Sequence, residues 1–407
     1  MAELRRELGV LDAVIVGAGS MIGAGVFSAW GPATGAAGTG VLLGLAAAAV
    51  VAFCNATSSA QLAAVHPESG GTYVYARRQL GPVWGYLAGW GFVVGKTASC
   101  VAIALTAGSY LWPAYERPVA IAAVLAVALV NVGGLTRTVL VTKLLLAVAL
   151  AALCAVVIAG WSTEETTPSR ITPFETTPAD VLQSGGFLFF AFAGYARIAT
   201  LGEEVRDPAT TIPRAIPRAL AGVLAIYAIV CITVLAALPV GDIAGSGAPL
   251  ALVVSSSPLD QLGPVVRIGA GIAALGVLLN LIPGVSRTTL AMARRGELPR
   301  WLATIDERRS LPIRAEAVVT VVVAALTAVL DLRGAIGFSG VTVLTYYAIT
   351  NAACLTLGRE RRRWPPALAV VGLVGCVALA VALPLTATAA GAGVLIVGLA
   401  IRTAARR

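Results

Sequence analysis

Apolar positions in this 407-residue chain form runs of about 20 residues, separated by short polar segments, from Leu11 to Ile401. A helix rises ~1.5 Å per residue, so a run of this length crosses a hydrocarbon layer about 30 Å thick. The alternating strands of a membrane barrel are not found. The pattern therefore predicts an all-α polytopic membrane protein of about 12 spans, because helices bond their own backbone groups in lipid. The expected spans are residues 11–34, 40–64, 83–112, 118–134, 138–160, 181–202, 215–239, 264–291, 314–330, 335–357, 366–384 and 386–402.

The composition supports a chain that lies mostly in lipid. Hydrophobic residues make up 58% of it and charged residues only 12%, whereas soluble domains carry roughly 25% charged residues. The longest polar stretches, residues 161–180 and 293–314, have the length of loops. We therefore expect residues 1–407 to form a single transmembrane domain with the lipid bilayer as its main partner.

The net charge of +9 could indicate a nucleic-acid partner, but its distribution argues against one. If both termini are cytoplasmic, about 22 of the basic residues fall on the inner side and about 4 on the outer side, as the positive-inside rule requires. No nucleic-acid binding is expected, and the predicted location is the plasma membrane. The outer basic residues are Arg117, Arg170, Arg267 and Arg333.

The chain offers little material for a metal, cofactor or catalytic site. Its six cysteines lie in apolar spans without a close-spaced pair, and His66 is the only histidine. No cofactor and no metal are expected, and an enzyme would need a catalytic constellation that the sequence lacks. A channel is also disfavoured, because no repeated filter loop or charged ring is found.

Two of the predicted spans are interrupted by small residues. The first contains GAGSMIGAG at 17–25, and the sixth reads GGFLFFAFAGYARIATLGEE at 185–204. Their starts are about 170 residues apart, and five spans, counting the first, separate one start from the other. An odd number of spans predicts a repeat that is inverted in the membrane. We expect one repeat over residues 11–160 and a second over 181–357, with 366–402 outside both.

The glycines of the first span make a continuous helix unfavourable, since each costs about 1 kcal/mol relative to alanine. Unwinding frees amide groups that favour an anion and carbonyls that favour a cation, which suits a zwitterion. Two alternatives are a GxxxG packing face made by Gly19 and Gly23 and a loose dinucleotide fingerprint. The fingerprint lacks a βαβ unit, and the packing face does not explain the matching break in the sixth span.

Four segments resemble the amino acid/polyamine/organocation permeases. They are GSMIGAGVF at 19–27, PESGGTYVYARRQLGP at 67–82, FFAFAGYARIATLGEEVRDPATTIPRAI at 189–216 and SRTTLAMARRGELPRWLA at 286–303. The resemblance implies a LeuT-like fold of two inverted five-helix repeats plus two C-terminal helices. It also implies that the chain carries a small-molecule substrate, an amino acid or related amine, by alternating access, as a monomer or homodimer.

The resemblance further implies a substrate site at the two breaks. The substrate carboxylate is expected at the backbone amides of Ala24 and Gly25, with Ser20 nearby. Its amino group is expected at carbonyls near Ile22, Phe190 and Ala193, and the Phe190 ring matches an aromatic gate or is simply a packing residue. The expected substrate-binding set is Ser20, Ile22, Gly23, Ala24, Gly25, Phe190, Ala193, Gly194 and Arg197.

Three cationic residues fall within the predicted spans, where a charge is energetically costly, so each needs a structural or functional explanation. Lys143 matches a lysine that couples protons in sodium-independent relatives; alternatively, it extends to the nearby cytoplasmic interface. Arg197 follows the second break and either pairs with an anionic substrate group or braces the break, and bracing is favoured. Lys96, in the third span, is a candidate pocket residue.

No acidic residue is expected deep within any span, so a cationic substrate side chain would find like charge and no partner. The sequence therefore predicts a secondary transporter for a neutral or anionic amino acid, driven by protons or by exchange. A cationic amino acid or polyamine permease of the same fold is the alternative.

Overall fold

A computed structural model describes residues 8–66, 70–133, 139–172, 176–195, 198, 205–306 and 311–404. These residues form helices and connecting turns, with two isolated β-bridges. Many large apolar side chains on the outside of the bundle are exposed, Leu129 and Val381 among them, as expected for a surface that faces lipid. The chain is thus an all-α multi-pass membrane protein.

Helices follow the predicted spans closely in position. The first span contains α1 (Val10–Met21), α2 (Ala24–Ser28) and α3 (Trp30–Ala37). The others are α4 (Val41–Val65), α6 (Pro82–Leu111), α7 (Glu116–Val132), α8 (Val139–Gly160), α9 (Pro178–Phe192), α11 (Pro208–Ala237), α14 (Gly263–Arg294), α15 (Ile313–Val329), α16 (Leu332–Leu355), α17 (Pro366–Ala382) and α18 (Leu385–Ala404). Short helices α5 (Thr72–Gln79), α12 (Val240–Gly245) and α13 (Pro249–Ser255) lie between them.

Within the described ranges, nine helical segments are long and apolar enough to cross a membrane. The helices α9, α15 and α17 match three further predicted spans but are only 15, 17 and 17 residues long. The number twelve therefore stays a prediction. One boundary was clearly misplaced: α11 begins at Pro208 rather than at residue 215, because Pro208 starts the helix and Pro213 and Pro217 are accommodated inside it.

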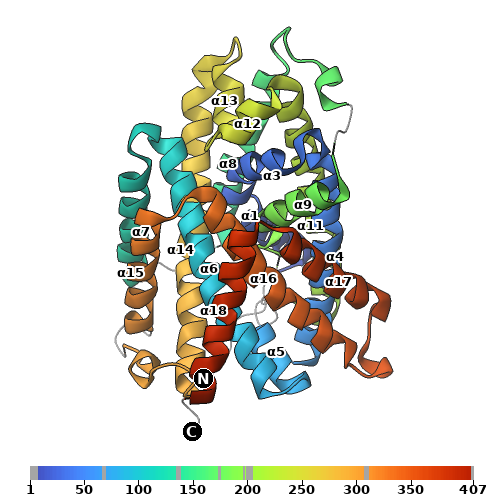
Figure 1. The fold of residues 1–407 in the computed structure, drawn as a ribbon, viewed down its shortest axis with the longest axis vertical. Helices are drawn as coiled ribbons and strands as arrows, with labels where there is room; N and C mark the ends of the chain where they lie inside the picture. The colour runs from blue at the N-terminus through green and yellow to red at the C-terminus, as the bar shows by residue number, and fades with distance from the viewer. Residues whose placement is uncertain are drawn as a thin grey trace.

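The two ends of the chain lie at the same end of the bundle, together with α5, whereas α12 and α13 lie at the opposite end (Figure 1). We call these the termini end and the far end. Helix α6 packs against both α14 and α16. The completely buried side chains of the bundle include the rings of Tyr110 on α6, Tyr227 on α11 and Phe192 on α9.

Arginines at the far end bond the last carbonyls of helices. Arg117 donates to Ala328 O at the end of α15, and Arg170 donates to Ala237 O at the end of α11 over 2.9 Å. Arg267 donates to Tyr110 O near the end of α6 over 3.3 Å. Cations are favourable at helix C-termini, so these exceptions to the charge asymmetry have a structural role.

Candidate functional site

The first predicted break is present in the structure. Helix α1 ends at Met21, Ile22 has φ −77° and ψ 76°, and α2 begins at Ala24. The amide of Ile22 still bonds Ala18 O at 2.7 Å, and that of Gly23 bonds Met21 O at 2.9 Å. The first amides of α2 have no partner within their own helix. Ala24 and Gly25 therefore lie at the start of a half-helix, and the carboxylate site expected there stays a prediction.

The second break is present as well. Helix α9 begins with a capping box of Thr177 and Asp180 and ends at Phe192. A turn follows at 193–195, in which Ala193 N bonds Phe190 O at 3.4 Å and Tyr195 N bonds Phe192 O at 3.2 Å. The predicted span 181–202 is therefore interrupted near its middle.

Direct backbone contact joins the two breaks. A Cβ atom at Gly194 would lie 2.0 Å from Ser20 O, and one at Gly25 would lie 2.5 Å from the Cα of Ala191. Real Cβ contacts are never this short, so only glycine allows the chains to approach so closely. Gly25 and Gly194 thus allow two segments that are far apart in the sequence to meet at one place.

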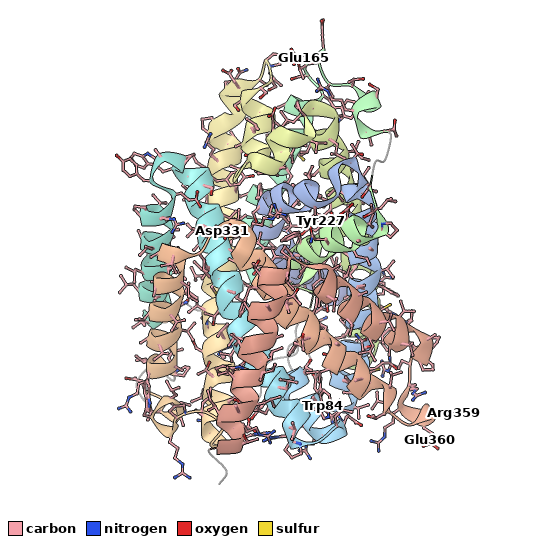
Figure 2. All side chains as sticks on the ribbon, in the orientation of Figure 1. Trp84, Glu165, Tyr227, Asp331, Arg359 and Glu360 are labelled. Carbon is pink, nitrogen blue, oxygen red and sulfur yellow. The ribbon has the colours of Figure 1, made fainter. Side chains whose placement is uncertain are left out.

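A buried tyrosine that the sequence reasoning missed bonds both breaks. The hydroxyl of Tyr227, on α11, lies 2.7 Å from Met21 O and 3.0 Å from Ala191 O. Figure 2 shows Tyr227 in the middle of the bundle, far from Glu165 at one end and Trp84 at the other. A tyrosine hydroxyl in an apolar span usually needs a hydrogen-bond partner. That requirement was the sequence feature that could have pointed to Tyr227.

The four glycines of the first span each face a different neighbour. A Cβ at Gly19 would meet Thr142 on α8, and a Cβ at Gly23 would meet Val277 on α14. Gly19 and Gly23 therefore do not form one GxxxG packing face, and that alternative is wrong. All of these glycines nevertheless serve close packing as well as the break.

The remaining predicted substrate contacts differ in availability. The hydroxyl of Ser20 donates to Val16 O at 2.8 Å and so bonds its own helix. The side chain of Phe190 is half-buried against the core. Arg197 lies outside the described residues.

The predicted coupling residue Lys143 forms an ion pair. Its Nζ lies 2.9 Å from Oδ1 of Asp12, in the first turn of α1, and the two side chains are 44% and 32% exposed. The preceding residue, Thr142, lies against Gly19, where a Cβ would be 3.1 Å from Thr142 Cγ2. The sequence reasoning overlooked Asp12 as a partner.

Lys96 is buried on α6, with 8% of its surface exposed. No carboxylate in the described part of the chain forms an ion pair with it. The structure thus places two of the predicted cations in very different surroundings.

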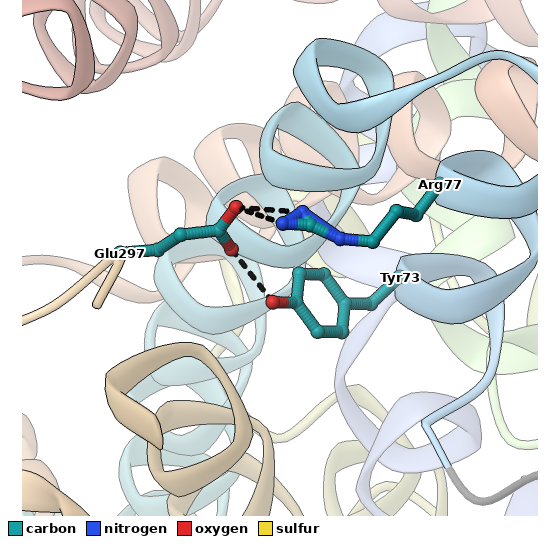
Figure 3. A network of polar contacts seen from close by, with 3 residues as sticks. All are labelled: Tyr73, Arg77 and Glu297. Atoms are coloured by element: carbon teal, nitrogen blue, oxygen red, sulfur yellow. Dashed lines mark hydrogen bonds and ion pairs between the residues drawn. The ribbon is translucent and has the colours of Figure 1, made fainter. Parts of the chain in front are cut away.

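A charged cluster at the termini end joins α5 to the end of α14 (Figure 3). The carboxylate of Glu297 accepts from Arg77 Nη1 and Nη2 at 2.8 and 2.6 Å and from the Tyr73 hydroxyl at 2.6 Å. The guanidinium of Arg295 lies 5.2 Å from the centre of the Tyr73 ring. Burial, reinforced by Glu297, raises the pKa of Tyr73, so its hydroxyl keeps its proton and remains a donor.

The chain is similar in sequence to known transport proteins. The profile of the amino acid permease family matches residues 8–400. An uncharacterised transporter of Mycobacterium tuberculosis is 59% identical over 98% of this chain and 91% of its own length. A branched-chain amino acid permease of Bacillus subtilis is 23% identical over 91% of this chain and 84% of its own length. A chloroplastic cationic amino acid transporter of Arabidopsis thaliana is 26% identical over 86% of this chain and 65% of its own length.

Proposed function

Because the chain belongs to the amino acid permease family, we propose that it is a secondary transporter for a neutral or anionic amino acid, working by alternating access. The bundle that carries the two breaks would rock against the remaining helices around a fixed site. The observation that carries this proposal is the crossing of the breaks, where Gly194 lies against the backbone of Ser20.

The crossing supplies opposite partial charges at one place. First-turn amides of α2, at Ala24 and Gly25, suit a carboxylate. Carbonyls beside the turn at 193–195 and at the end of α1 suit an ammonium group. In this proposal the α-carboxylate and α-ammonium of the substrate bind these backbone groups, and the site recognises any amino acid by its main-chain atoms.

Transport is driven by protons or by exchange in this proposal, and Lys143 stays the candidate for coupling. Its ammonium group lies 2.9 Å from Asp12 on α1, so the charged form of Lys143 has a partner on the first half of the broken helix. Arg197 remains a candidate brace for the second break.

Uptake of radiolabelled amino acids by the purified protein in proteoliposomes tests the proposal. We expect saturable uptake of at least one neutral or anionic amino acid, driven by an inward proton gradient or by internal substrate. Gly194→Ala is expected to abolish this uptake, because the new methyl group would push the breaks apart. The matched control is Gly222→Ala on α11, where no heavy atom lies within 4 Å of the added Cβ.

Two results would overturn the proposal. One is that no amino acid is taken up under any driving force by protein that is shown to be folded. The other is that Gly194→Ala and Gly222→Ala transport equally well, which would remove the crossing from the mechanism.

A further inference from the structure

Lys96 is a buried cation at mid-length of α6 that the proposed main-chain contacts leave unused. The residue is only 8% exposed, because most of α6 is buried inside the bundle. In the described part of the chain it forms no ion pair. Buried charges are normally paired, so the question is which anion Lys96 meets.

The face of α6 that carries Lys96 points into the bundle. Residues seven apart, about two turns, lie on one side of a helix. Lys96 therefore shares its side of α6 with Gly89, Ile103 and Tyr110. A Cβ at Gly89 would meet Tyr73 and Met292, and the Tyr110 hydroxyl donates to Phe27 O on α2 at 2.7 Å. The side therefore runs from the end of α14 to the second half of the broken first helix.

A row of aromatic rings connects the same region to the second break. Phe92, one turn before Lys96, has its ring centre 5.3 Å from that of Tyr346. Tyr346 lies 5.0 Å from Tyr347, and Tyr347 lies 5.2 Å from Tyr195 in the turn after α9. Lys96 is thus placed between the two breaks and the termini end, on the side of α6 that faces them.

Within the described residues, no carboxylate pairs with Lys96. On α16, Thr342 lies against Gly95 and Ser339 bonds Ser99, so the polar groups shown next to Lys96 along α6 are neutral hydroxyls. The carboxylates of Asp12 and Glu297 are engaged by Lys143 and Arg77, and the buried Glu316 forms no ion pair with Lys96. An ammonium group with no carboxylate partner among the described residues, beside the proposed substrate site, favours a ligand that brings its own negative charge.

We propose that Lys96 selects an amino acid with a second carboxylate on its side chain and binds that carboxylate. The inference rests on the proposed transport function, in which the backbone groups at the breaks already take the α-carboxylate and α-ammonium of the substrate. The substrate side chain is then the part that reaches α6. Lys96 is a specificity residue for a dicarboxylic amino acid such as glutamate or aspartate.

The test compares acids with their neutral amides in proteoliposomes. Wild-type protein is expected to take up glutamate or aspartate with a KM about 10- to 100-fold lower than that for glutamine or asparagine, the range that a charge-assisted hydrogen bond gives. Lys96→Gln should remove this preference by raising the KM for the acid, with little change for the amide. Lys96→Arg keeps the charge and should retain the preference.

Several outcomes separate this inference from the function on which it rests. If wild-type protein transports neutral amino acids and does not prefer acids, the role of Lys96 is overturned while amino acid transport stands. Equal changes for acid and amide in Lys96→Gln would also overturn it, because they would indicate contact with the α-carboxylate. If Lys96→Gln does not fold, the absence of a wild-type preference for glutamate over glutamine still overturns the role of Lys96. Failure of wild-type protein to carry any amino acid overturns both proposals.

Discussion

Two short segments at opposite ends of the bundle are held by different forces. At the termini end, α5 is fixed by the ion pair between Arg77 and Glu297, with oxygen–nitrogen distances down to 2.6 Å. At the far end, α12 lies on α3, where a Cβ at Gly31 would be 2.8 Å from Ser246 O at the end of α12. The only charged residue of that second segment, Asp242, forms no ion pair with the described chain.

The comparison is informative because the two segments hold equivalent places in the predicted repeats. Helix α5 follows the second span of the first repeat, and α12 with α13 follows the second span of the other. The far-end segment is held by shape and by neutral hydrogen bonds, since Leu250 N donates to the Tyr110 hydroxyl, which itself donates to Phe27 O. Helix α5 is held by charge. We infer that volume changes loosen the far-end segment and that charge changes loosen α5.

The largest effect is expected from Glu297→Ala. Its side chain is 3% exposed and that of Arg77 is 20% exposed, so removal of the carboxylate leaves a largely buried cation and should cost about 3–5 kcal/mol of unfolding free energy. Thermal unfolding in detergent measures the change. The matched control is Glu360→Ala at the same end, an exposed residue whose loss should be within about 0.5 kcal/mol.

A double-variant cycle sharpens that prediction. Arg77→Ala combined with Glu297→Ala should cost less than the sum of the single changes, because the unpaired charge is gone. Additive losses would show that the two side chains do not act together, and α5 would then be held by packing like the far-end segment.

An intermediate effect is expected from Gly31→Ala at the far end. The added methyl group would overlap with the carbonyl of Ser246, and overpacking of this kind costs about 1–3 kcal/mol. Gly241→Ala in α12 is the control, because its Cβ would meet no atom within 4 Å. If raised salt weakened the far-end contact as much as the ion pair at the termini end, the contrast between the segments would be lost.

The smallest effect on stability is expected from Lys143→Met. Its pair with Asp12 is largely exposed, and exposed pairs contribute about 0.2–1 kcal/mol. Transport gives the sharper readout: if Lys143 couples protons, uptake driven by a pH gradient should be lost while exchange of substrate survives. Asp12→Asn removes the same pair and is the matched variant; an unaltered pH dependence in both would leave Lys143 as an interfacial anchor.

Much of the fold could be predicted because it depends on local sequence. Apolar runs specify helices in lipid wherever they are long enough, so the helix ends at Val65, Leu111 and Gly160 were placed within a few residues. The breaks were also predictable, since glycines weaken a helix where they stand. The start of α11 was missed because a helix that accommodates Pro213 and Pro217 looks like a loop in the sequence.

The partners of individual side chains could not be predicted in this way. Asp12 was overlooked for Lys143 although they lie on helices of the same predicted repeat, and Tyr227 was overlooked although it bonds both breaks. A hydrogen-bond partner depends on distances of a few tenths of an ångström, which hydrophobic periodicity does not contain.

The sequence by itself therefore determined that the chain is a helical membrane protein with two interrupted helices, because solvent and backbone propensity act locally. Only the tertiary structure decided that Gly194 meets Ser20, that Tyr227 joins the breaks and that Arg77 finds Glu297, 220 residues away. Those meetings follow from how the helices pack, and packing couples residues whose separation along the chain carries no information about their distance in space.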